Sequence, residues 1–248
     1  MDGFFRNFGN AGDFVVVALM RVIPALICIT IHELAHGLAA YKLGDRTAKE
    51  MGRLTLNPIK HIDPLGLLMM LIVRFGWAKP VPVDINNFKY PKWYMAITAI
   101  AGPVSNLILA AFVMFILGLL STSLGMIIIF NTDYPLGVII PISLTVDAGF
   151  IVGEIIMNTI IISVALAIFN MLPIPPLDGS KVLFSLLPEK TYFGLMRYER
   201  YGILILLLVI YAGPIFGIDI FSRTIGQLLN TIVSNLSSVY EVALRLVN

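Results

Sequence analysis

Long apolar segments constrain the fold of this chain more than any other feature of its sequence. Of its 248 residues, 58% are hydrophobic and only 13% are charged, about half the charged fraction of an ordinary soluble domain. A helix that crosses a bilayer needs about 20 apolar residues, and four segments are long enough: 14–42, 93–120, 148–172 and 199–217. The sequence therefore predicts an all-α polytopic membrane protein with about four transmembrane helices.

The lysines and arginines indicate how these segments are oriented. Nine lie between positions 42 and 92, none between 93 and 180, and four between 181 and 200. Because basic residues are retained on the cytoplasmic side of a membrane, we expect residues 43–92 and 179–198 to be cytoplasmic. The N-terminus and residues 121–147 are then external. The net charge of +2 gives no indication of a nucleic-acid partner.

The segments between and after the spans are also partly apolar. Residues 67–73 are too short to cross a membrane and, with the alternating Pro-Val-Pro-Val at 80–83, predict a short strand or re-entrant cytoplasmic segment. Residues 218–248 alternate in a helical manner and predict an amphipathic helix lying on the membrane surface. We expect a membrane domain over 1–217, with its core at 14–187, and a C-terminal helical tail over 218–248.

A polar motif, His-Glu-Leu-Ala-His at 32–36, interrupts the first apolar segment. On a helix His32 and His36 share one face, so both imidazoles can reach one ion. Glu33 lies beside them and can take a proton from a zinc-bound water, whose pKa zinc lowers to about 7. The alternative is that the histidines only bond to neighbouring helices, but ionisable residues at membrane depth are usually functional.

A catalytic zinc site needs a third protein ligand. Lys42 stands six residues after His36, where another class of metalloprotease has a histidine, and Glu50 and His61 lie in polar turns. Asp178 is the best candidate, because the prolines at 173–176 end the third span and return the chain to the cytoplasmic half of the membrane. The alternative for Asp178 is that it only caps the helix that follows.

Two asparagines lie at membrane depth near these groups. Asn106 follows Gly102 and Pro103 by one turn and is expected to face inward, where it could hold a substrate backbone or stabilise an oxyanion. An ordinary interhelical hydrogen bond would explain it equally well. Asn170 ends a helical stripe of small and polar residues, and either contacts substrate or orders the unwound stretch before Asp178.

Three motifs together resemble the site-2 protease family of intramembrane zinc metalloproteases: HELAHG at 32–37, AGPVSN at 101–106 and NMLPIPPLDG at 170–179. The match is to a minimal member without PDZ-like or CBS-like domains. The resemblance implies that His32, His36 and Asp178 bind one zinc ion and that Glu33 is the general base. It also implies an endopeptidase that hydrolyses a peptide bond in or near a transmembrane segment of a membrane-protein substrate.

These expectations place the protein in the lipid bilayer of a prokaryotic cell, with the site towards the cytoplasm. An unwound substrate would pair with an exposed edge in the 79–84 region. The alternatives are a metal-ion transporter or a non-catalytic membrane regulator that uses the same cluster. The position of Glu33 and the absence of repeated halves favour the enzyme.

Overall fold

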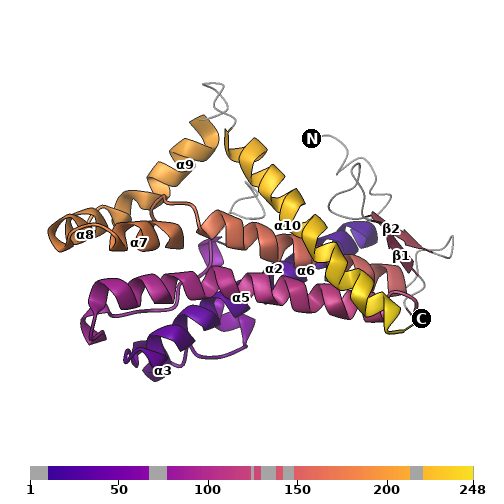
Figure 1. The fold of residues 1–248 in the computed structure, drawn as a ribbon, viewed down its shortest axis with the longest axis horizontal. Helices are drawn as coiled ribbons and strands as arrows, with labels where there is room; N and C mark the ends of the chain where they lie inside the picture. The colour runs from indigo at the N-terminus through magenta and orange to yellow at the C-terminus, as the bar shows by residue number, and fades with distance from the viewer. Residues whose placement is uncertain are drawn as a thin grey trace.

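Three long helices form the centre of the protein in a computed structural model, which describes residues 11–66, 77–123, 126–129, 138–141, 148–212 and 220–247. They are α2 (Ala11–Lys42), α5 (Pro91–Leu120) and α6 (Ala148–Asn170) (Figure 1). Each contains a segment long and apolar enough to cross a membrane: Leu19–Lys42, Pro91–Leu120 and Ile151–Asn170. The first three expected spans are thus helices, with ends within a few residues of those predicted.

The fourth expected span, 199–217, is only partly described. It contains a short 3-10 turn, η3 (Glu199–Tyr201), and the 11-residue helix α9 (Gly202–Ala212); residues 213–219 lie outside the described part. At 1.5 Å per residue, α9 is roughly 16 Å long, about half of a hydrocarbon core of ~30 Å. Within the described residues the structure therefore supports three candidate spans, and the fourth remains a prediction.

The helix ends follow local sequence signals. Helix α5 begins with Pro91, whose missing N–H costs nothing in a first turn. Helix α6 ends at Asn170, and the prolines at 173–176 prevent its continuation. Two short helices follow, α7 (Asp178–Ser185) and α8 (Glu189–Met196). Figure 1 shows α3 (Thr47–Glu50), α7 and α8 at the same end of the bundle.

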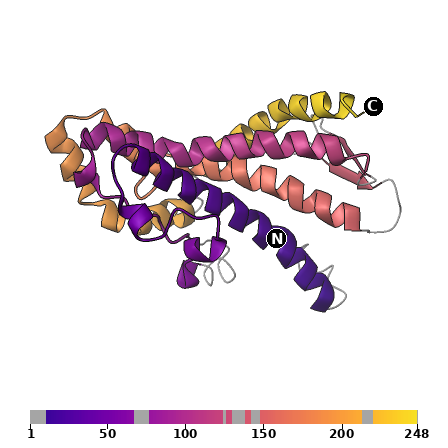
Figure 2. The same cartoon turned by 90° about the horizontal axis from the view of Figure 1, so that it is seen from below.

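Helices α5 and α6 form a central pair that is covered on two sides. Helix α2 packs on both helices from one side, and α10 (Ile220–Arg245) packs on both from the other side (Figure 2). The core between α5, α6 and α10 includes one cluster of buried hydrophobic side chains: Ala110, Met114, Leu117, Met157, Ile160, Val164, Val233 and Tyr240, joined by Ile128.

The C-terminal helix differs from its prediction in where it lies. Residues 220–245 form an amphipathic helix, as expected, but the helix crosses α5 and α6 obliquely (Figure 1) and packs on them from Leu229 to Leu244 instead of lying apart from them. The helices touch closely at Gly118, where an added Cβ would come within 2.5 Å of the Tyr240 carbonyl oxygen. Helix α10 therefore shares the core of the bundle.

The connections carry little regular structure. The expected re-entrant piece at 67–73 lies outside the described residues, and the 78–84 stretch is extended, with a single β-bridge from Ala78 to Ile62. The 3-10 turn η1 (Pro58–His61) directly precedes Ile62, and a second 3-10 turn, η2 (Ile85–Asn87), directly follows the extended stretch. Two short antiparallel strands, β1 (Met126–Ile129) and β2 (Val138–Pro141), lie instead in the connection expected to be external. Figure 1 shows them at the opposite end from α3 and α7.

Candidate metal centre

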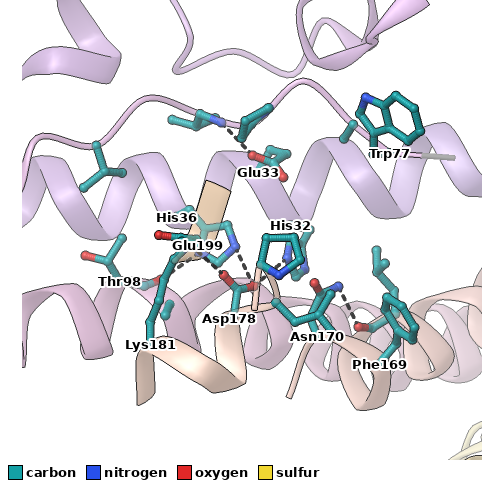
Figure 3. Close-up of a pocket in the computed structure, with 18 of the residues that line it drawn as sticks. His32, Glu33, His36, Trp77, Thr98, Phe169, Asn170, Asp178, Lys181 and Glu199 are labelled. Carbon is teal, nitrogen blue, oxygen red and sulfur yellow. Dashed lines mark hydrogen bonds and ion pairs between the residues drawn. The ribbon is translucent and has the colours of Figure 1, made fainter. Parts of the chain in front are cut away.

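Two histidines on α2 and the first residue of α7 meet at one point (Figure 3). The Asp178 Oδ2 atom lies 3.2 Å from His32 Nε2 and 3.1 Å from His36 Nε2. One ligand atom from each of the three side chains lies within 4.8 Å of the others. His32 and Asp178 are buried, and only 12% of the His36 side chain is exposed. Residues 146 positions apart in sequence thus form one buried cluster.

Asp178 reaches the histidines because of the backbone that precedes it. Helix α6 stops at Asn170, the proline-rich stretch crosses back, and α7 starts at Asp178 itself. The carboxylate contacts both histidines, and no side-chain cap is formed at this helix start. The capping role considered from the sequence is therefore not the one that the structure shows.

Lys181 sits one turn further along α7 and contacts the same carboxylate. Its Nζ atom is 3.8 Å from Asp178 Oδ1 and 3.5 Å from Glu199 Oε1. Burial alone would raise the pKa of Asp178, but hydrogen bonds from His32 and His36 and the charge of Lys181 outweigh it and lower that pKa below its ordinary 3.8. Asp178 is thus held as a carboxylate, the form that binds a metal.

A backbone carbonyl fixes the tautomer of His36. The His36 Nδ1 atom is 2.7 Å from the Thr98 carbonyl oxygen on α5. Because a carbonyl only accepts, Nδ1 carries a hydrogen, so Nε2 is the nitrogen that can give up its proton and bind a metal. The set of two imidazole nitrogens and one carboxylate oxygen is a usual protein ligand set for catalytic zinc, which leaves the fourth position open. The residues present therefore fit a zinc ion.

Glu33 lies beside the cluster and is held by the extended segment. Its Oε2 atom accepts a hydrogen bond of 2.8 Å from the backbone N–H of Val81. Figure 3 shows Glu33 on the side of α2 that faces this segment, next to the two histidines. The 78–84 stretch, where we expected an exposed edge, thus uses one of its N–H groups to bind the carboxylate.

Gly102 on α5 makes room for both imidazole rings. A Cβ at this position would lie 2.5 Å from His36 Cε1 and Nε2, and 2.7 Å from His32 Cε1. Real Cβ atoms do not approach so closely, so any side chain here would displace the rings. The glycine of the AGPVSN motif at 101–106 therefore leaves the space that the two rings occupy.

The cluster opens into a cavity of about 510 Å³. Its polar lining includes His32, Glu33, His36, Asn170, Asp178, Lys181 and Glu199. Asn170 donates to the Leu166 carbonyl oxygen at 2.9 Å. Asn106 does not line the cavity: it is fully buried, and neither polar atom of its side chain has a hydrogen-bond partner among the described residues.

The other sequence candidates lie away from the cluster. The Nε2 atom of His61 bonds to the Thr55 carbonyl oxygen at 2.9 Å, and Glu50 is exposed on α3. Sequence reasoning missed Lys181, Gly102 and two backbone groups, the Val81 N–H and the Thr98 carbonyl. Only Lys181 had a usable signal, since a basic residue three positions after a carboxylate shares its helix face.

A carboxylate and two histidines joined inside a bundle of apolar helices, with a glutamate beside them, are the arrangement typical of a metallohydrolase site. The chain belongs to Peptidase family M50, whose model matches residues 20–213. It is 40% identical over 194 residues to "Putative zinc metalloprotease YwhC" of Bacillus subtilis (strain 168), covering 78% of this chain and 80% of that protein.

More distant relatives carry a similar description. The chain is 27% identical over 202 residues to "Putative zinc metalloprotease Rip2" of Mycolicibacterium smegmatis, covering 80% of this chain and 69% of the relative. It is 29% identical over 208 residues to the Rip2 protein of Mycobacterium tuberculosis (strain H37Rv), covering 82% and 69%. No solved structure matches the chain significantly. The protein is thus a membrane protein of a zinc metalloprotease family, and its cofactor is zinc.

Proposed function

We propose that this protein is a zinc-dependent intramembrane endopeptidase that cleaves a peptide bond in or near a transmembrane segment of a membrane protein. The observation that carries the proposal is a buried cluster with Glu33 beside it: His32 and His36, on a helix of membrane-spanning length, meet Asp178 at the start of α7. The family and the names of the relatives support a zinc metalloprotease. They do not favour a transporter or a silent regulator.

His32, His36 and Asp178 would hold one zinc ion through two Nε2 atoms and a carboxylate oxygen. When bound, zinc supplies a Lewis acid for the scissile carbonyl and lowers the pKa of water. Glu33 then acts as the general base: it takes a proton from the attacking water and passes it to the leaving amine. The Val81 N–H holds Oε2 of Glu33, which orients the carboxylate and leaves Oε1 to exchange the proton.

The cavity offers places for an unwound substrate. Asn170 is on its wall, where its side chain can contact a substrate backbone or order the turn before Asp178. Asn106 stays a candidate for substrate or oxyanion binding, and that role requires its buried side chain to gain access to the cavity. The extended 79–84 stretch is a candidate edge for pairing with substrate, since its Pro80 and Val81 line the same cavity.

The site is expected to face the cytoplasm of a prokaryotic cell. The cluster lies at the end of the bundle that carries α3 and α7, and the sequence there is rich in lysine and arginine. The bacterial relatives agree with a prokaryotic membrane. Labelling of an introduced cysteine at exposed Lys49 on α3, from one side of sealed vesicles, tests the orientation.

The proposal is tested by replacing Glu33 with Gln in the purified full chain. Zinc content, measured by elemental analysis, should stay near one ion per chain, while cleavage of a transmembrane test peptide should fall at least about 100-fold. His36→Ala should lose both zinc and cleavage. Glu50→Gln, an exposed glutamate outside the cluster, is the matched control and should retain both.

Full cleavage by Glu33→Gln would contradict the mechanism. Zinc flux into vesicles by the unaltered chain, without any cleavage, would favour the transporter instead. Comparison of membrane proteomes from cells with the unaltered chain and with Glu33→Gln should reveal the natural substrates as single-span proteins that accumulate in the variant.

A further inference from the structure

Helix α10 presents a continuous polar surface on the side that faces away from the bundle. We call it the polar stripe and define it by residues spaced three or four apart: Gln227, Thr231, Ser234, Ser238, Glu241 and Arg245. All are exposed except Ser234, which is partly exposed. The opposite face of α10 packs on α5 and α6 through Leu229, Ile232, Val233, Leu236, Tyr240 and Ala243.

The polar stripe lies at the depth of the membrane-spanning helices. On its packed side, Val233 and Tyr240 share one core with Ala110 and Met114 of α5. Near the end of α5, a Cβ at Gly118 would come within 2.7 Å of the Ala243 Cβ atom. Both contact regions belong to the candidate span Pro91–Leu120. The part of the stripe between these contacts, from Ser234 to Glu241, therefore runs alongside an apolar helix, and Arg245 lies near the end of that helix.

Part of the polar stripe has no partner within the described residues. Its hydroxyl groups donate to carbonyl oxygens of their own helix, at 2.8 Å from Thr231, 3.0 Å from Ser234 and 2.8 Å from Ser238. The side chains of Gln227, Glu241 and Arg245 form no hydrogen bond or ion pair with any residue that the structure describes. A side chain that lipid surrounds gains no partner from it, and polar side chains in membranes commonly pair across helices.

A substrate in the catalytic cavity cannot cover this surface. The described lining of the cavity comes from α2, the 77–83 segment, α5, the end of α6 and the chain between residues 176 and 206, and includes no residue of α10. Figure 2 shows α2 and α10 on opposite sides of the α5 and α6 pair. The occupant of the polar stripe is therefore a different one from the peptide being cleaved.

The composition of the polar stripe is complementary to itself. It has one acidic and one basic residue, Glu241 and Arg245, one helical turn apart, together with hydroxyl and amide groups that both donate and accept. In a two-fold pair of parallel helices, Glu241 of each copy can reach the partner's Arg245, so that each contact is made twice. A second copy thus supplies every complement that the stripe lacks.

We propose that two copies of this chain associate in the membrane through the polar stripes of their α10 helices. Hydroxyl and amide groups meet along the middle of the interface, and two Glu241–Arg245 pairs meet near its C-terminal end. This proposal concerns a face of the molecule remote from the cluster, and its test does not depend on the cleavage reaction.

Charge reversal tests the pairing directly in the full chain. Two differently tagged copies are expressed together in membranes, solubilised in mild detergent and purified through one tag. Glu241→Arg or Arg245→Glu in both copies should reduce recovery of the second copy at least about fivefold. Combining one copy that carries Glu241→Arg with one that carries Arg245→Glu should restore recovery of the second copy. Two positive charges in one stripe then meet two negative charges in the other. Glu189→Lys, an exposed charge on α8, is the control and should change nothing.

Cysteine cross-linking supplies a second measurement that does not alter charge. In a Cys28→Ala background, Ser234→Cys or Ser238→Cys should give a disulfide-linked dimer on mild oxidation in intact membranes. Val233→Cys, on the packed face, should give none. The proposal would be overturned if neither serine position gave a dimer or if the cross-link joined another protein. Ready labelling of Ser238→Cys by a membrane-impermeant maleimide would also overturn it, as would failure of the charge-reversed pair to restore association.

Discussion

At the scale of single residues, the metal centre depends on a position that has no side chain. Gly102 allows the two imidazole rings to lie against α5, and a Cβ there would lie 2.5 Å from His36 Nε2. Gly102→Ala should therefore lower zinc affinity by roughly 10–100-fold, as changes beside metal ligands do, measured by titration with a competing chelator. Gly194→Ala on α8, where a Cβ has open space, should bind zinc normally. Unchanged affinity in Gly102→Ala would contradict the packing described.

Lys181 is a second residue whose effect should pass through a ligand. Its Nζ atom lies 3.8 Å from Asp178 Oδ1 and 3.5 Å from Glu199 Oε1, and so holds the carboxylate through the oxygen that the histidines do not contact. Lys181→Met should weaken zinc binding by roughly tenfold, whereas Lys181→Arg should retain most of it. If Lys181→Met binds zinc as the unaltered chain does, the ion pair does not position Asp178.

At the scale of elements, Asp45 connects the end of α2 to the segment that reaches Glu33. Its Oδ1 atom accepts from the Thr47 N–H at 3.0 Å and from Asn87 Nδ2 at 2.8 Å, and its Oδ2 atom accepts from the Asp84 N–H at 2.8 Å. These contacts hold the turn η2 against α2. Because η2 follows directly on the 78–84 stretch, they also restrain the position of Val81.

Asp45→Asn should destabilise the chain by about 2 kcal/mol at neutral pH, since hydrogen bonds to a charged group are being weakened. Burial raises the pKa of Asp45, but bonds from Thr47, Asn87 and Asp84 outweigh it and lower that pKa below 3.8. The stability contribution is therefore complete above the unfolded pKa and is lost as the pH falls through the folded one. The difference in unfolding midpoint between Asp45→Asn and the unaltered chain should shrink below about pH 4; a difference that stays constant to pH 3 would argue against this.

The elements were largely predictable because hydropathy and prolines are local signals. Residues 93–120 and 148–172 were expected as spans and form α5 and α6 over 91–120 and 148–170. The approach of Asp178 to the histidines followed from the prolines and the expected topology. The hydrogen bonds of His36 to the Thr98 carbonyl and of Glu33 to the Val81 N–H could not be predicted. Almost every residue has the same backbone groups, so the sequence does not show which of them lie near the site. The position of α10 could not be predicted either, because the same amphipathic pattern is typical of a helix that lies on a bilayer surface and of a helix that packs on a bundle.

At the scale of the whole molecule, α10 is a structural part of the bundle, and one glycine permits its approach. Gly118→Val would push a side chain against the backbone of Tyr240 and should destabilise the chain by about 1–3 kcal/mol, as overpacking usually does. The measurement is the thermal midpoint in detergent, together with the rate at which a protease releases α10. Gly226→Ala, which meets open space, is the control. A protein unaffected by Gly118→Val would show that α10 does not need this close contact.

The metal centre also has a mechanical consequence. Its three side chains come from α2 and α7, with His32 and Asp178 separated by 146 residues, so one bound ion would tie these two helices together as a covalent cross-link does. A movement that separated α7 from α2 would then have to break a coordinate bond, so a bound ion would restrain α7. Zinc at 100 times its dissociation constant would add about 2.7 kcal/mol to the folded state, and a chelator should lower the melting temperature and speed the proteolysis of α7 and α8 together.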